Sequence, residues 1–447
     1  MITARAFAGK HYAVLGLARS GLATVNALLA SGARVTAWDD NPQAQEKLFS
    51  RVGGSPDAAR SAASGSGLGP CLRRETEWDL SEFDSIVVTP GLPLNRHPIA
   101  GRAKDAGVEI IGDIELFARA RPELPPHKVV GITGTNGKST TTALVHHILK
   151  TAGVPTEMGG NIGLPILAQD PLPAGGVYVL ELSSYQIDLT QSLDCDVAVL
   201  LNITPDHLDR YESFEAYATS KMRLFEMQTP GHNMVVRVTE AHDFNIPGQG
   251  VVASFIEDVF DFKEMRPKEQ REWPAMQGPH NLENASAAIE VCDILGLQVQ
   301  QIRDGLRTYP GLPHRMERVA EKGGVLFVND SKATNPTATA PALAAFPKIR
   351  WICGGQAKSD NLDECAPHFD HVRKAYTIGE AGEMFASLLS PHMAVAECVT
   401  LDEAVRAAAS EAQAGDTVLL SPACASFDQF RDFEARGDAF RVLVGEL

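Results

Sequence analysis

The sequence predicts an α/β protein of three domains in which short apolar strands alternate with helices. The chain has 447 residues, which is enough for about three domains of ordinary size. Strand-like and helix-like segments alternate along most of the chain, as they do in proteins with parallel sheets. In the middle of the chain an apolar strand runs into the sequence GITGTNGKST, which is typical of a phosphate-binding loop.

Composition and charge are those of an ordinary globular protein. Hydrophobic residues make up 44% of the chain and charged residues 21%. The formal net charge of −16 argues against a nucleic-acid partner, because binding to a phosphate backbone needs an excess of Lys and Arg. The sequence has no apolar run of about 18 residues and no signal-peptide pattern, so we expect no membrane partner. Seven cysteines without a Cys-x-x-Cys pair indicate reduced thiols in a cytoplasm.

Residues 1–122 predict a first domain that begins with a βαβ unit. The turn between its first strand and its helix, Gly16 to Gly21, resembles a dinucleotide fingerprint in which Ala18 replaces the middle glycine. Asp39 stands at the end of the second strand. Because the middle glycine normally lets the backbone approach a pyrophosphate, Ala18 argues against standard NAD binding and leaves another nucleotide open. The expected elements are His11 to Gly16, Ser20 to Ser31 and Arg34 to Trp38.

The rest of this domain contains an insertion, one more strand and a linker. The Ser-, Ala- and Gly-rich stretch from Gly53 to Pro70 has too few apolar residues for a core and predicts a flexible surface insertion. The strand Asp84 to Thr89 ends at Pro90-Gly91, at the sheet edge where open α/β sheets bind ligands. The proline-dense segment Arg121 to Pro126 then predicts a linker to the next domain.

The phosphate-binding loop lies in a second expected domain, residues 123–312. The backbone N–H groups of such a loop point at one spot, where the dipole of the following helix favours an anion. We expect Lys138 to bind the β- and γ-phosphates of a nucleotide and the Ser139 hydroxyl to bind Mg²⁺. Ile132 stands where the general pattern has glycine, which indicates a specialised subclass. A glycine-rich turn that only caps a helix is the alternative.

Polar residues follow two further strands of this domain. The strand Val177 to Leu182 contains Glu181 near its end, and the strand Val197 to Ile203 leads into Thr204-Pro205-Asp206-His207. Because the carboxyl ends of parallel strands share one edge of the sheet, Glu181 and His207 are placed to reach a metal bound to the γ-phosphate. A helix cap or a hydrogen-bonded surface group is the alternative for each residue taken singly.

Two helical patterns complete the second domain. The segment from Phe214 to Met227 has an amphipathic helical pattern and contains Lys221. Taken alone, Lys221 is expected to be a solvated lysine. A second helix is expected at His280 to Asn284, and the turn-rich segment Tyr309 to Arg315 marks the next boundary.

The third expected domain, residues 313–447, resumes the alternation of strands and helices. Loops of small and polar residues, Asn329 to Pro336 and Ser421 to Asp428, follow two of its strands and lead toward helices. Ser421 and Ser426 are placed either to cap helices or to bind a ligand, and capping is favoured for each serine taken alone. The expected strands are Val325 to Val328, Arg350 to Cys353 and Thr417 to Leu420.

These motifs together resemble the Mur ligases, the ATP-dependent amide-forming enzymes that build the peptidoglycan stem peptide. The GTNGKS loop marks the superfamily, which includes folylpolyglutamate synthases, while LPHR, NDSKATNP and SPACASFDQF resemble the member that adds glutamate to UDP-N-acetylmuramoyl-L-alanine. The resemblance spans essentially the whole chain. It implies a Rossmann-like domain that binds UDP, a central P-loop ATPase domain and a Rossmann-like C-terminal domain that brings the amino acid. UDP in place of NAD also accounts for Ala18.

The resemblance also implies the site residues. The expected ATP contacts are Gly134, Thr135, Asn136, Gly137, Lys138, Ser139, Thr140, Asn284, Arg315 and Asp330. The UDP-substrate positions are Arg19, Ser20, Asp39, Thr89, Asn161 and His207, although Asp40-Asn41 stands where the family has a more basic pattern. The amino-acid positions are Lys332, Thr334, Lys358, Ser426 and Phe433. Catalysis is expected of Lys138, His207, Lys221, Arg315 and Lys332. Two Mg²⁺ sites are expected from Ser139, Glu181, His207 and Lys221, with Lys221 carbamylated by CO₂.

These residue types support one reaction. A carboxylate has a poor leaving group, but transfer of the γ-phosphoryl group of ATP gives an acyl phosphate that an amine can attack. Mg²⁺ and Lys138 offset the charge repulsion between carboxylate and ATP, and Lys358 with hydroxyls such as Thr334 suits an amino acid with two carboxylates. We expect domain closure to bring the three ligands together. The expected protein is a monomer with UDP-N-acetylmuramoyl-L-alanine, D-glutamate and ATP as its small-molecule partners.

Other functions stay open at this point. L-glutamate carries the same charges as D-glutamate, and a folylpolyglutamate-synthase-like ligase has the same phosphate loop. A nucleotide-dependent switch protein would hydrolyse ATP without an acyl acceptor. A dehydrogenase based on the first βαβ unit is disfavoured by Ala18 and by the phosphate loop.

Overall fold

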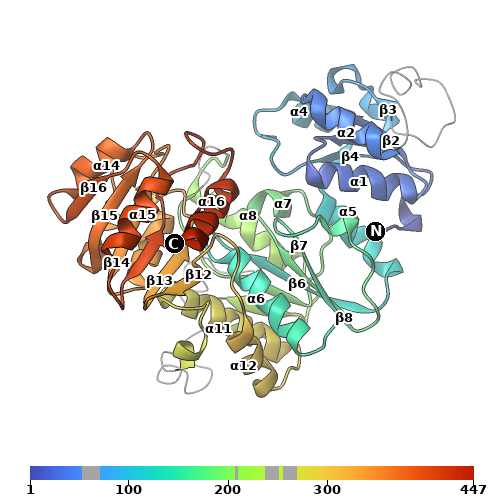
Figure 1. Cartoon of the computed structure of the whole chain (residues 1–447). Helices are drawn as coiled ribbons and strands as arrows, with labels where there is room; N and C mark the ends of the chain where they lie inside the picture. Colours follow the sequence, from blue (N-terminus) through green and yellow to red (C-terminus); the bar gives the residue numbers. More distant parts are fainter. Residues whose placement is uncertain (53–70, 207–209, 237–250, 255–268) are drawn as a thin grey trace. The chain divides into compact units, whose positions relative to one another are not determined.

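The structure is a computed structural model that describes residues 1–52, 71–206, 210–236, 251–254 and 269–447. The chain forms two compact units, Met1–Phe260 with Ser286–Ile302 and Asp261–Ala285 with Arg303–Leu447. The described residues contain three sheets of five, six and six strands, and helices pack on them (Figure 1). The predicted α/β class with mostly parallel sheets is therefore confirmed. Each sheet falls within one of the three expected domains, whose boundaries at residues 122 and 312 stay predictions.

The first sheet is fully parallel and has the strand order β3-β2-β1-β4-β5. On one face, Tyr12 and Val14 pack in the core that includes helix α1, and on the other Ala13 and Leu15 pack with α4. Helices on both faces of a parallel sheet are typical of a Rossmann-like domain. Its strands are β1 (His11–Leu15), β2 (Arg34–Trp38), β3 (Cys71–Leu72), β4 (Ser85–Val88) and β5 (Glu109–Ile111). Its helices are α1 (Arg19–Ala30), α2 (Pro42–Val52), α4 (Pro98–Ala106) and α5 (Asp113–Ala120).

The second sheet is also parallel, with the order β11-β10-β9-β6-β8-β7. Every residue of β8 is buried, as expected for a central strand of a sheet covered on both faces. Its strands are β6 (His127–Thr133), β7 (Thr156–Gly160), β8 (Gly176–Glu181), β9 (Val197–Leu200), β10 (Asn233–Val236) and β11 (Val251–Ser254). The helices that follow along this part of the chain are α6 (Lys138–Thr151), α7 (Ser184–Asp188), α8 (Phe214–Glu226), α11 (Pro279–Ile294) and α12 (Val299–Thr308).

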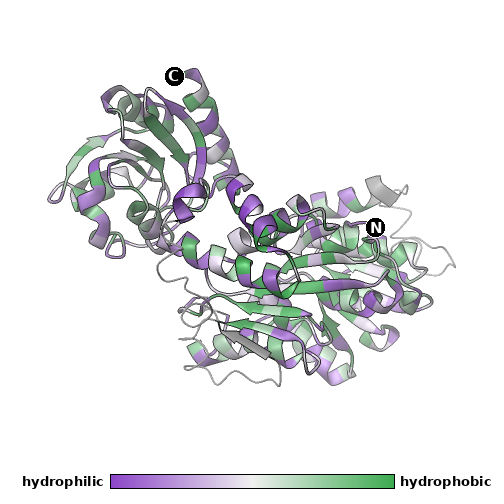
Figure 2. Cartoon of the chain, turned by 90° about the horizontal axis from the view of Figure 1, so that it is seen from below, coloured by the Kyte–Doolittle hydropathy of each residue, from purple (hydrophilic) through white to green (hydrophobic). Residues whose placement is uncertain are grey.

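The third sheet has the order β12-β13-β17-β14-β15-β16, and only its edge strand β12 is antiparallel to its neighbour. Phe327 and Val418 lie in one core, and Val328 and Leu419 lie in the core on the opposite face. Figure 2 shows the hydrophobic residues along the strands and the hydrophilic residues on outer helix faces. Its strands are β12 (Glu317–Lys322), β13 (Val325–Asn329), β14 (Ile349–Gly354), β15 (Val372–Ile378), β16 (Ala394–Glu397) and β17 (Thr417–Leu420). Its helices are α13 (Pro336–Ala344), α14 (Gly382–Leu389), α15 (Leu401–Glu411) and α16 (Phe433–Glu446).

The segments between the sheets differ in part from the sequence expectation. The proline-dense segment after Ala120 is held in place, because the Glu123 carboxylate accepts the backbone N–H groups of Arg5 and Ala6, each at 2.9 Å. It therefore connects two sheets of one compact unit as an anchored turn. The helix expected soon after Ser426 begins only at Phe433. The expected surface insertion at residues 53–70 lies outside the described residues.

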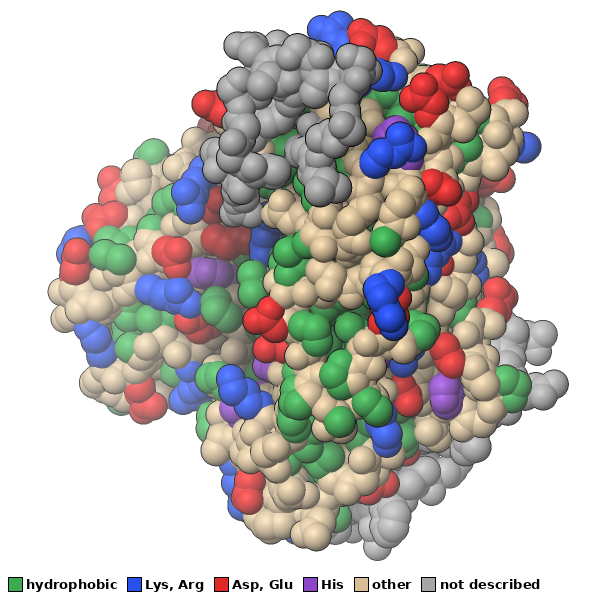
Figure 3. Space-filling view, turned by 90° about the vertical axis from the view of Figure 1, so that its right-hand side faces the viewer, with side chains coloured by type: hydrophobic (Ala, Val, Ile, Leu, Met, Phe, Trp, Pro, Cys, Tyr) green, Lys and Arg blue, Asp and Glu red, His purple; other side chains and the backbone are tan. Residues whose placement is uncertain are grey.

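Two surface properties bear on the partners of the chain. In the part of the chain that the structure covers, no helix is both long enough and apolar enough to cross a membrane. Acidic and basic side chains are interspersed over the described part of the face seen in Figure 3, with hydrophobic side chains between them.

Candidate functional site

The expected phosphate-binding loop joins the end of β6 to the start of α6. Gly134 has φ 152° and Gly137 has φ 84°, values that favour glycine over residues with a Cβ atom. A Cβ atom at Gly134 would lie 3.1 Å from the Leu201 Cβ, so the loop also packs closely on the segment after β9. The expected order of strand, loop and helix is confirmed.

Residues after β9 hold the loop in shape. The backbone N–H of Thr135 donates to the Asn202 carbonyl at 2.9 Å, and the N–H of Asn136 donates to the Asn202 Oδ1 at 2.8 Å. The Thr135 hydroxyl accepts the N–H of Thr204 at 3.0 Å. Neither Asn202 nor Thr204 was among the expected site residues. The sequence did contain a signal for them, because both residues follow a strand that ends at the sheet edge where the loop was expected.

The lysine of the loop folds back over it. Lys138 Nζ donates to the carbonyl oxygens of Gly134 and Thr135, each at 2.8 Å. Ser139 is buried in the first turn of α6, and Thr140, beside it, is half-buried. A charged amine at the start of a helix, next to a buried hydroxyl, can receive a phosphate group and its cation.

Glu181 lies at the end of β8, where it pairs in register with Ile132 of β6. Its side chain is 2% exposed, and its Oε1 accepts the Asn161 Nδ2 at 2.9 Å. The other oxygen, Oε2, is buried and has no hydrogen-bond partner. A buried carboxylate oxygen without a donor is costly unless a cation meets it, and carboxylate and hydroxyl oxygens are ligands that Mg²⁺ prefers. The residues therefore fit a magnesium site.

The described residues supply few protein ligands for such a metal. They contain no group of three or more His, Cys, Asp or Glu side chains arranged to hold an ion. Mg²⁺ is commonly bound by one or two protein groups together with substrate phosphates and water, so this arrangement suits a metal that arrives with a nucleotide. His207, the expected histidine ligand, lies outside the described residues.

Lys221 is buried on α8, so the solvated lysine expected from its helical pattern alone is wrong. Its side chain is 1% exposed and its Nζ donates to the Gly134 carbonyl at 2.9 Å. The same Nζ lies 4.6 Å from the centre of the Tyr217 ring. Burial, reinforced by the nearby charge of Lys138, lowers the pKa of Lys221 to about 7. A substantial fraction of this amine is therefore neutral near neutral pH.

The glycine turn after β1 packs against Thr89, one of the expected UDP-side residues. A Cβ atom at Gly16 would lie 2.3 Å from the Thr89 Oγ1, and one at Gly21 would lie 1.9 Å from the Gly16 carbonyl oxygen. Ser20 and Thr89 also line a small cavity together with the buried side chain of Asp113. Burial raises the pKa of Asp113 to about 6.

A larger cavity of about 900 Å³ lies next to this turn. The Asp39 carboxylate shapes its wall by accepting the backbone N–H of Leu17 at 2.6 Å and that of Asn41 at 2.8 Å. Arg19 reaches across to the Gly163 carbonyl at 2.6 Å. Side chains not expected from the sequence also line this cavity, among them Asn41, Lys47 and Leu164. Expected residues that line it are Arg19 and Asp39.

In the second unit, Asp330 forms a buried polar centre. Its Oδ2 accepts the Ser421 hydroxyl at 2.8 Å and its Oδ1 accepts the Met316 N–H at 3.1 Å. Burial raises the pKa of Asp330 to about 7, although the two hydrogen bonds and the charge of Arg315 oppose this shift. The Ser421 Oγ also lies 3.1 Å from the Thr339 Oγ1, its second hydrogen-bond partner. The expected role of Ser421 as a helix cap is therefore wrong, because it bonds within this centre.

Arg315 lies in a strained turn. The residues on either side of it, His314 and Met316, have φ 61° and φ 48°, a region that is sparsely populated by residues other than glycine. Asn284, the other expected adenosine contact in this unit, is buried, and its Nδ2 donates to the Asn281 Oδ1 at 3.3 Å.

The expected amino-acid residues form two pairs and a single buried serine. Lys332 Nζ lies 3.9 Å from the centre of the Phe433 ring, and Lys358 Nζ donates to the Thr334 Oγ1 at 3.4 Å. Ser426 is buried, and its carbonyl accepts the N–H groups of residues 429 and 430 at 3.1 and 2.7 Å. It therefore begins a turn, and the helix cap expected from its position alone is not formed.

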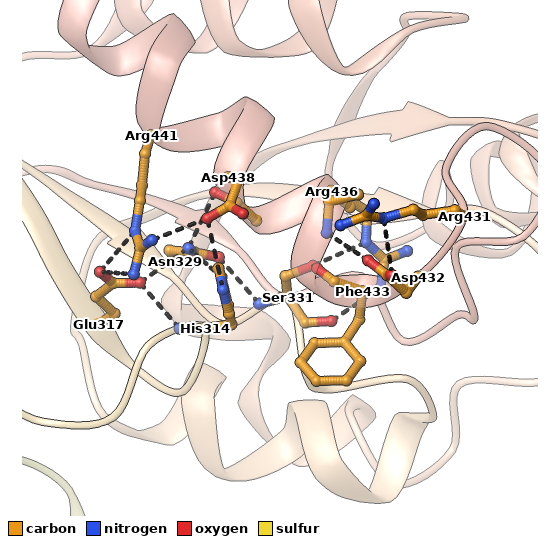
Figure 4. A network of polar contacts seen from close by, with 12 residues as sticks. His314, Glu317, Asn329, Ser331, Arg431, Asp432, Phe433, Arg436, Asp438 and Arg441 are labelled. Atoms are coloured by element: carbon orange, nitrogen blue, oxygen red, sulfur yellow. Dashed lines mark hydrogen bonds and ion pairs between the residues drawn. The ribbon is translucent and has the colours of Figure 1, made fainter. Parts of the chain in front are cut away.

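Arg436 on α16 joins these loops and was not expected from the sequence. Figure 4 shows its guanidinium beside Ser331 and close to Phe433. Its Nε donates to the Ser331 Oγ at 3.0 Å, and its Nη atoms donate to backbone carbonyls of the loop after β17. An arginine within a helical pattern carries no sequence signal that distinguishes it from a surface residue.

Comparisons with known proteins are consistent with this geometry. Residues 132–247 match the family model of the Mur ligase middle domain, and residues 314–424 match that of the Mur ligase glutamate ligase domain. The UDP-N-acetylmuramoylalanine--D-glutamate ligase of Novosphingobium aromaticivorans is 59% identical, over 100% of this chain and 97% of that protein. Proteins of the same name from Sphingopyxis alaskensis and Zymomonas mobilis are 56% and 54% identical, over 100% of both chains.

Solved structures of similar fold are more distant in sequence. The UDP-N-acetylmuramate-alanine ligase MurC of Thermotoga maritima has a TM-score of 0.57 at 16% identity, over 98% of this chain and 99% of that chain. The MurF ligase of the same organism, solved in complex with ADP, has a TM-score of 0.58 at 16% identity, over 98% and 96% of the two chains. These structures share the fold of the chain.

Proposed function

Because the chain belongs to the Mur ligase family, we propose that it is the ATP-dependent ligase that joins D-glutamate to UDP-N-acetylmuramoyl-L-alanine in peptidoglycan precursor synthesis. Relatives that carry the name of this ligase are 54–59% identical over the whole chain. The structural observation that carries the proposal is the convergence of Lys138 and Lys221 on the Gly134 carbonyl, on a sheet edge that also carries the buried carboxylate of Glu181.

The reaction follows from the groups on this edge. The carboxylate of UDP-N-acetylmuramoyl-L-alanine attacks the γ-phosphorus of ATP, which forms an acyl phosphate and releases ADP. The amine of D-glutamate then attacks the acyl carbon, phosphate leaves, and the amine loses a proton. Lys138 turns from the loop carbonyls to the β- and γ-phosphates and offsets the negative charge that gathers there.

The residues that would hold Mg²⁺ are Ser139 through its hydroxyl and Glu181 through its buried oxygens. When bound, Mg²⁺ supplies charge neutralisation on the transferred phosphoryl group. Lys221 contributes to a second site as a carbamate. Its lowered pKa supports this role, because only a neutral amine adds CO₂, and the product is an anion where the amine was a cation. The motif Thr204-Pro205-Asp206-His207 supports His207 as a further ligand of the metal or of the substrate.

The three ligands occupy separate sets of residues. The UDP-substrate positions are Arg19, Ser20, Asp39, Thr89 and Asn161, and the large cavity beside Arg19 and Asp39 supports the uridine diphosphate end. The adenosine and phosphate positions of the second unit are Asn284, Arg315 and Asp330. The amino-acid positions are Lys332, Thr334, Lys358, Ser426 and Phe433, which place two ammonium groups at a substrate with two carboxylates. Catalysis rests on Lys138, His207, Lys221, Arg315 and Lys332.

We further propose three domains with boundaries near residues 122 and 312, a monomeric state, and closure of the domains around the ligands. A cytoplasmic location is supported by the ATP and UDP-sugar substrates and by the seven cysteines, all of them free. Equal activity in a variant that is cross-linked open would contradict the closure.

The experiment is ADP release with Mg²⁺-ATP and UDP-N-acetylmuramoyl-L-alanine, with D-glutamate, L-glutamate or neither. Release that requires both the UDP substrate and D-glutamate supports the proposal. A preference for L-glutamate keeps the reaction and changes the substrate. A folate acceptor run in parallel tests the folylpolyglutamate alternative, and release without any acceptor indicates a nucleotide switch.

A further inference from the structure

Arg436 is a buried arginine that forms no ion pair with an acidic side chain in the described part of the chain. Its side chain is 1% exposed. Its hydrogen bonds go to neutral oxygens, namely the Ser331 Oγ at 3.0 Å, the Ser331 carbonyl at 2.9 Å and the carbonyls of Cys424 and Ala425 at 3.0 and 3.2 Å. Burial lowers the pKa of Arg436 to about 10, so the guanidinium stays protonated at neutral pH. A buried charge without a counter-ion opposes folding, and a methionine of similar volume would avoid that cost.

The four hydrogen bonds join two loops that carry the expected amino-acid residues. Ser331 precedes Lys332 in the loop after β13, and Ala425 precedes Ser426 in the loop after β17. Ser331 Oγ in turn donates to the carbonyl of Phe433 at 2.9 Å, so the first residue of α16 is tied to the same point (Figure 4). Arg436 thus lies behind residues expected to contact the substrate, without being one of them.

The third loop of this group, after β14, is attached to the loop after β17, which Arg436 contacts. Gln356 and Ala425 exchange two backbone hydrogen bonds of 2.9 Å, and Lys358 follows two residues later. A Cβ atom at Gly355 would lie 2.4 Å from the Ala425 carbonyl oxygen and 3.2 Å from the Arg436 Nη1. The loops therefore pack around the guanidinium without room for another side-chain atom at Gly355.

The acidic groups near Arg436 bond to other partners. Asp428, whose charge acts on Arg436 through space, accepts the backbone N–H of Glu380 at 3.1 Å. Asp432 caps α16 by accepting the N–H of Ala435 and pairs with Arg431 at 3.0 Å. Because charges interact more strongly in the protein interior than in water, the buried guanidinium adds a positive potential to that of Lys332 and Lys358.

We propose that Arg436 is a positioning residue for a dicarboxylic amino-acid substrate. It holds the three loops that carry Lys332, Thr334, Lys358 and Ser426 in one arrangement, and its unpaired positive charge favours the two carboxylates of that substrate. This inference rests on the proposed function. It adds to that function a residue that supports glutamate binding without contacting glutamate.

The test compares Michaelis constants for all three substrates in Arg436→Met and Arg436→Lys. Arg436→Met should raise the KM for D-glutamate about 10- to 100-fold, because loosened loops misplace several contacts at once, and should leave the KM values for ATP and the UDP substrate within about twofold of wild type. Arg436→Lys keeps the charge but loses some of the hydrogen bonds, so its KM for D-glutamate should lie between those of wild type and Arg436→Met.

Arg350→Met is the matched control. Arg350 is half-buried in the third sheet and, unlike Arg436, has carboxylate partners, Asp416 at 3.0 Å and Glu411 at 3.3 Å. This variant should melt at a lower temperature and keep the wild-type KM for D-glutamate. Equal KM values for D-glutamate in Arg436→Met and wild type, or a parallel rise in all three KM values, would overturn the proposal.

Two further measurements keep the outcome decisive. If Arg436→Met does not fold, Ser331→Ala replaces it, since it removes the hydroxyl that joins Arg436 to Phe433 and should raise the KM for D-glutamate alone. The rise in melting temperature caused by saturating D-glutamate is measured on the same proteins. A wild-type enzyme that is stabilised by D-glutamate but releases ADP without it would contradict the proposed function and still test Arg436, whose Met variant should lose the stabilisation.

Discussion

Lys138 and Lys221 donate to the same acceptor, the carbonyl oxygen of Gly134, at 2.8 and 2.9 Å. Two ammonium groups that share one oxygen repel each other, and Lys138 contributes to the lowered pKa of Lys221. In the Gly134 loop, burial and the charge of Lys138 therefore bias Lys221 toward the neutral amine. The lowered pKa of Lys221 leads to the first prediction.

Replacement of Lys221 by methionine should change how stability depends on pH. The folded pKa of about 7 lies below the ordinary value of 10.5, so the unfolded chain binds more protons between these values and the free energy of unfolding rises with pH across this window. In CO₂-free buffer Lys221→Met should lose this rise, as measured by urea unfolding at pH 7 and pH 9. Lys104→Met, a change at an exposed lysine on α4, should keep it. An unchanged pH profile in Lys221→Met would contradict the buried neutral amine.

Asp330→Asn should separate activity from stability. The pKa of Asp330 is raised from 3.8 to about 7, so the folded state holds a proton that the unfolded state has lost, and stability decreases as the pH rises from about 4 to 7. At pH 8 the asparagine variant should therefore unfold at a higher urea concentration than wild type, and the difference should shrink at pH 5. Ligase activity should fall by about 10-fold or more. Lower stability of the variant at pH 8 would refute this account.

Glu181→Gln tests the proposed magnesium site. The change keeps the size of the side chain but removes the negative charge beside the phosphate loop, so kcat/KM should fall about 10²- to 10³-fold and the Mg²⁺ concentration needed for half-maximal activity should rise. The melting temperature should not fall, since the buried Oε2 has no hydrogen-bond donor to lose. Glu157→Gln, at an exposed position on the neighbouring strand β7, is the control and should keep the wild-type metal dependence.

Two helical glycines should respond in opposite directions to alanine. In Gly21→Ala the new Cβ would lie 1.9 Å from the Gly16 carbonyl oxygen, so the glycine turn must move and stability should fall by about 1–3 kcal/mol, with a higher KM for the UDP substrate. Gly101 of α4 has nothing within 4 Å of that position, and Gly101→Ala should stabilise the protein by about 0.5–1 kcal/mol. The measurement is the melting temperature of both variants. Equal changes in the two melting temperatures would contradict the close contact between Gly21 and the Gly16 carbonyl oxygen.

Lys47→Gln probes the large cavity next to Asp39. Lys47 lines this cavity together with Arg19, in a chain that has Asp40-Asn41 where basic residues are expected. If Lys47 meets the diphosphate, its loss should raise the KM for the UDP substrate about 3- to 30-fold and leave the KM values for ATP and D-glutamate unchanged. Lys10→Gln, at an exposed residue before β1, serves as the comparison. A UDP-substrate KM at the wild-type value would exclude Lys47 from the site.

Local patterns in the sequence predicted the scaffold of the site well. The strand at Val129, the loop glycines and the helix that begins at Lys138 depend on neighbouring residues, and the structure has them as expected. Glu181 was also expected at the strand end beside the loop, because the edge shared by parallel strands is a property of topology. Elements of this kind can be read from periodicity and turn chemistry.

Contacts between distant segments could not be predicted in the same way. Lys221 has the helical pattern of a surface residue, and only its packing against the Gly134 loop makes it buried. Ser421 precedes a proline in a loop that resembles a helix start, yet its hydroxyl bonds to Asp330, 91 residues away. Arg436 bonds to Ser331, 105 residues away. The propensities of neighbouring residues cannot indicate such partners, because these residues come together only in the folded sheet.

The antiparallel strand β12 has a consequence for how this chain behaves at high concentration. An edge strand exposes unpaired backbone groups that can add a strand of another molecule and so begin aggregation. In β12 the two exposed side chains, Arg318 and Glu321, carry opposite charges and lie 3.7 Å apart, and an added strand would have to desolvate them. We therefore expect these two charges to disfavour pairing of the β12 edge with a strand of another molecule.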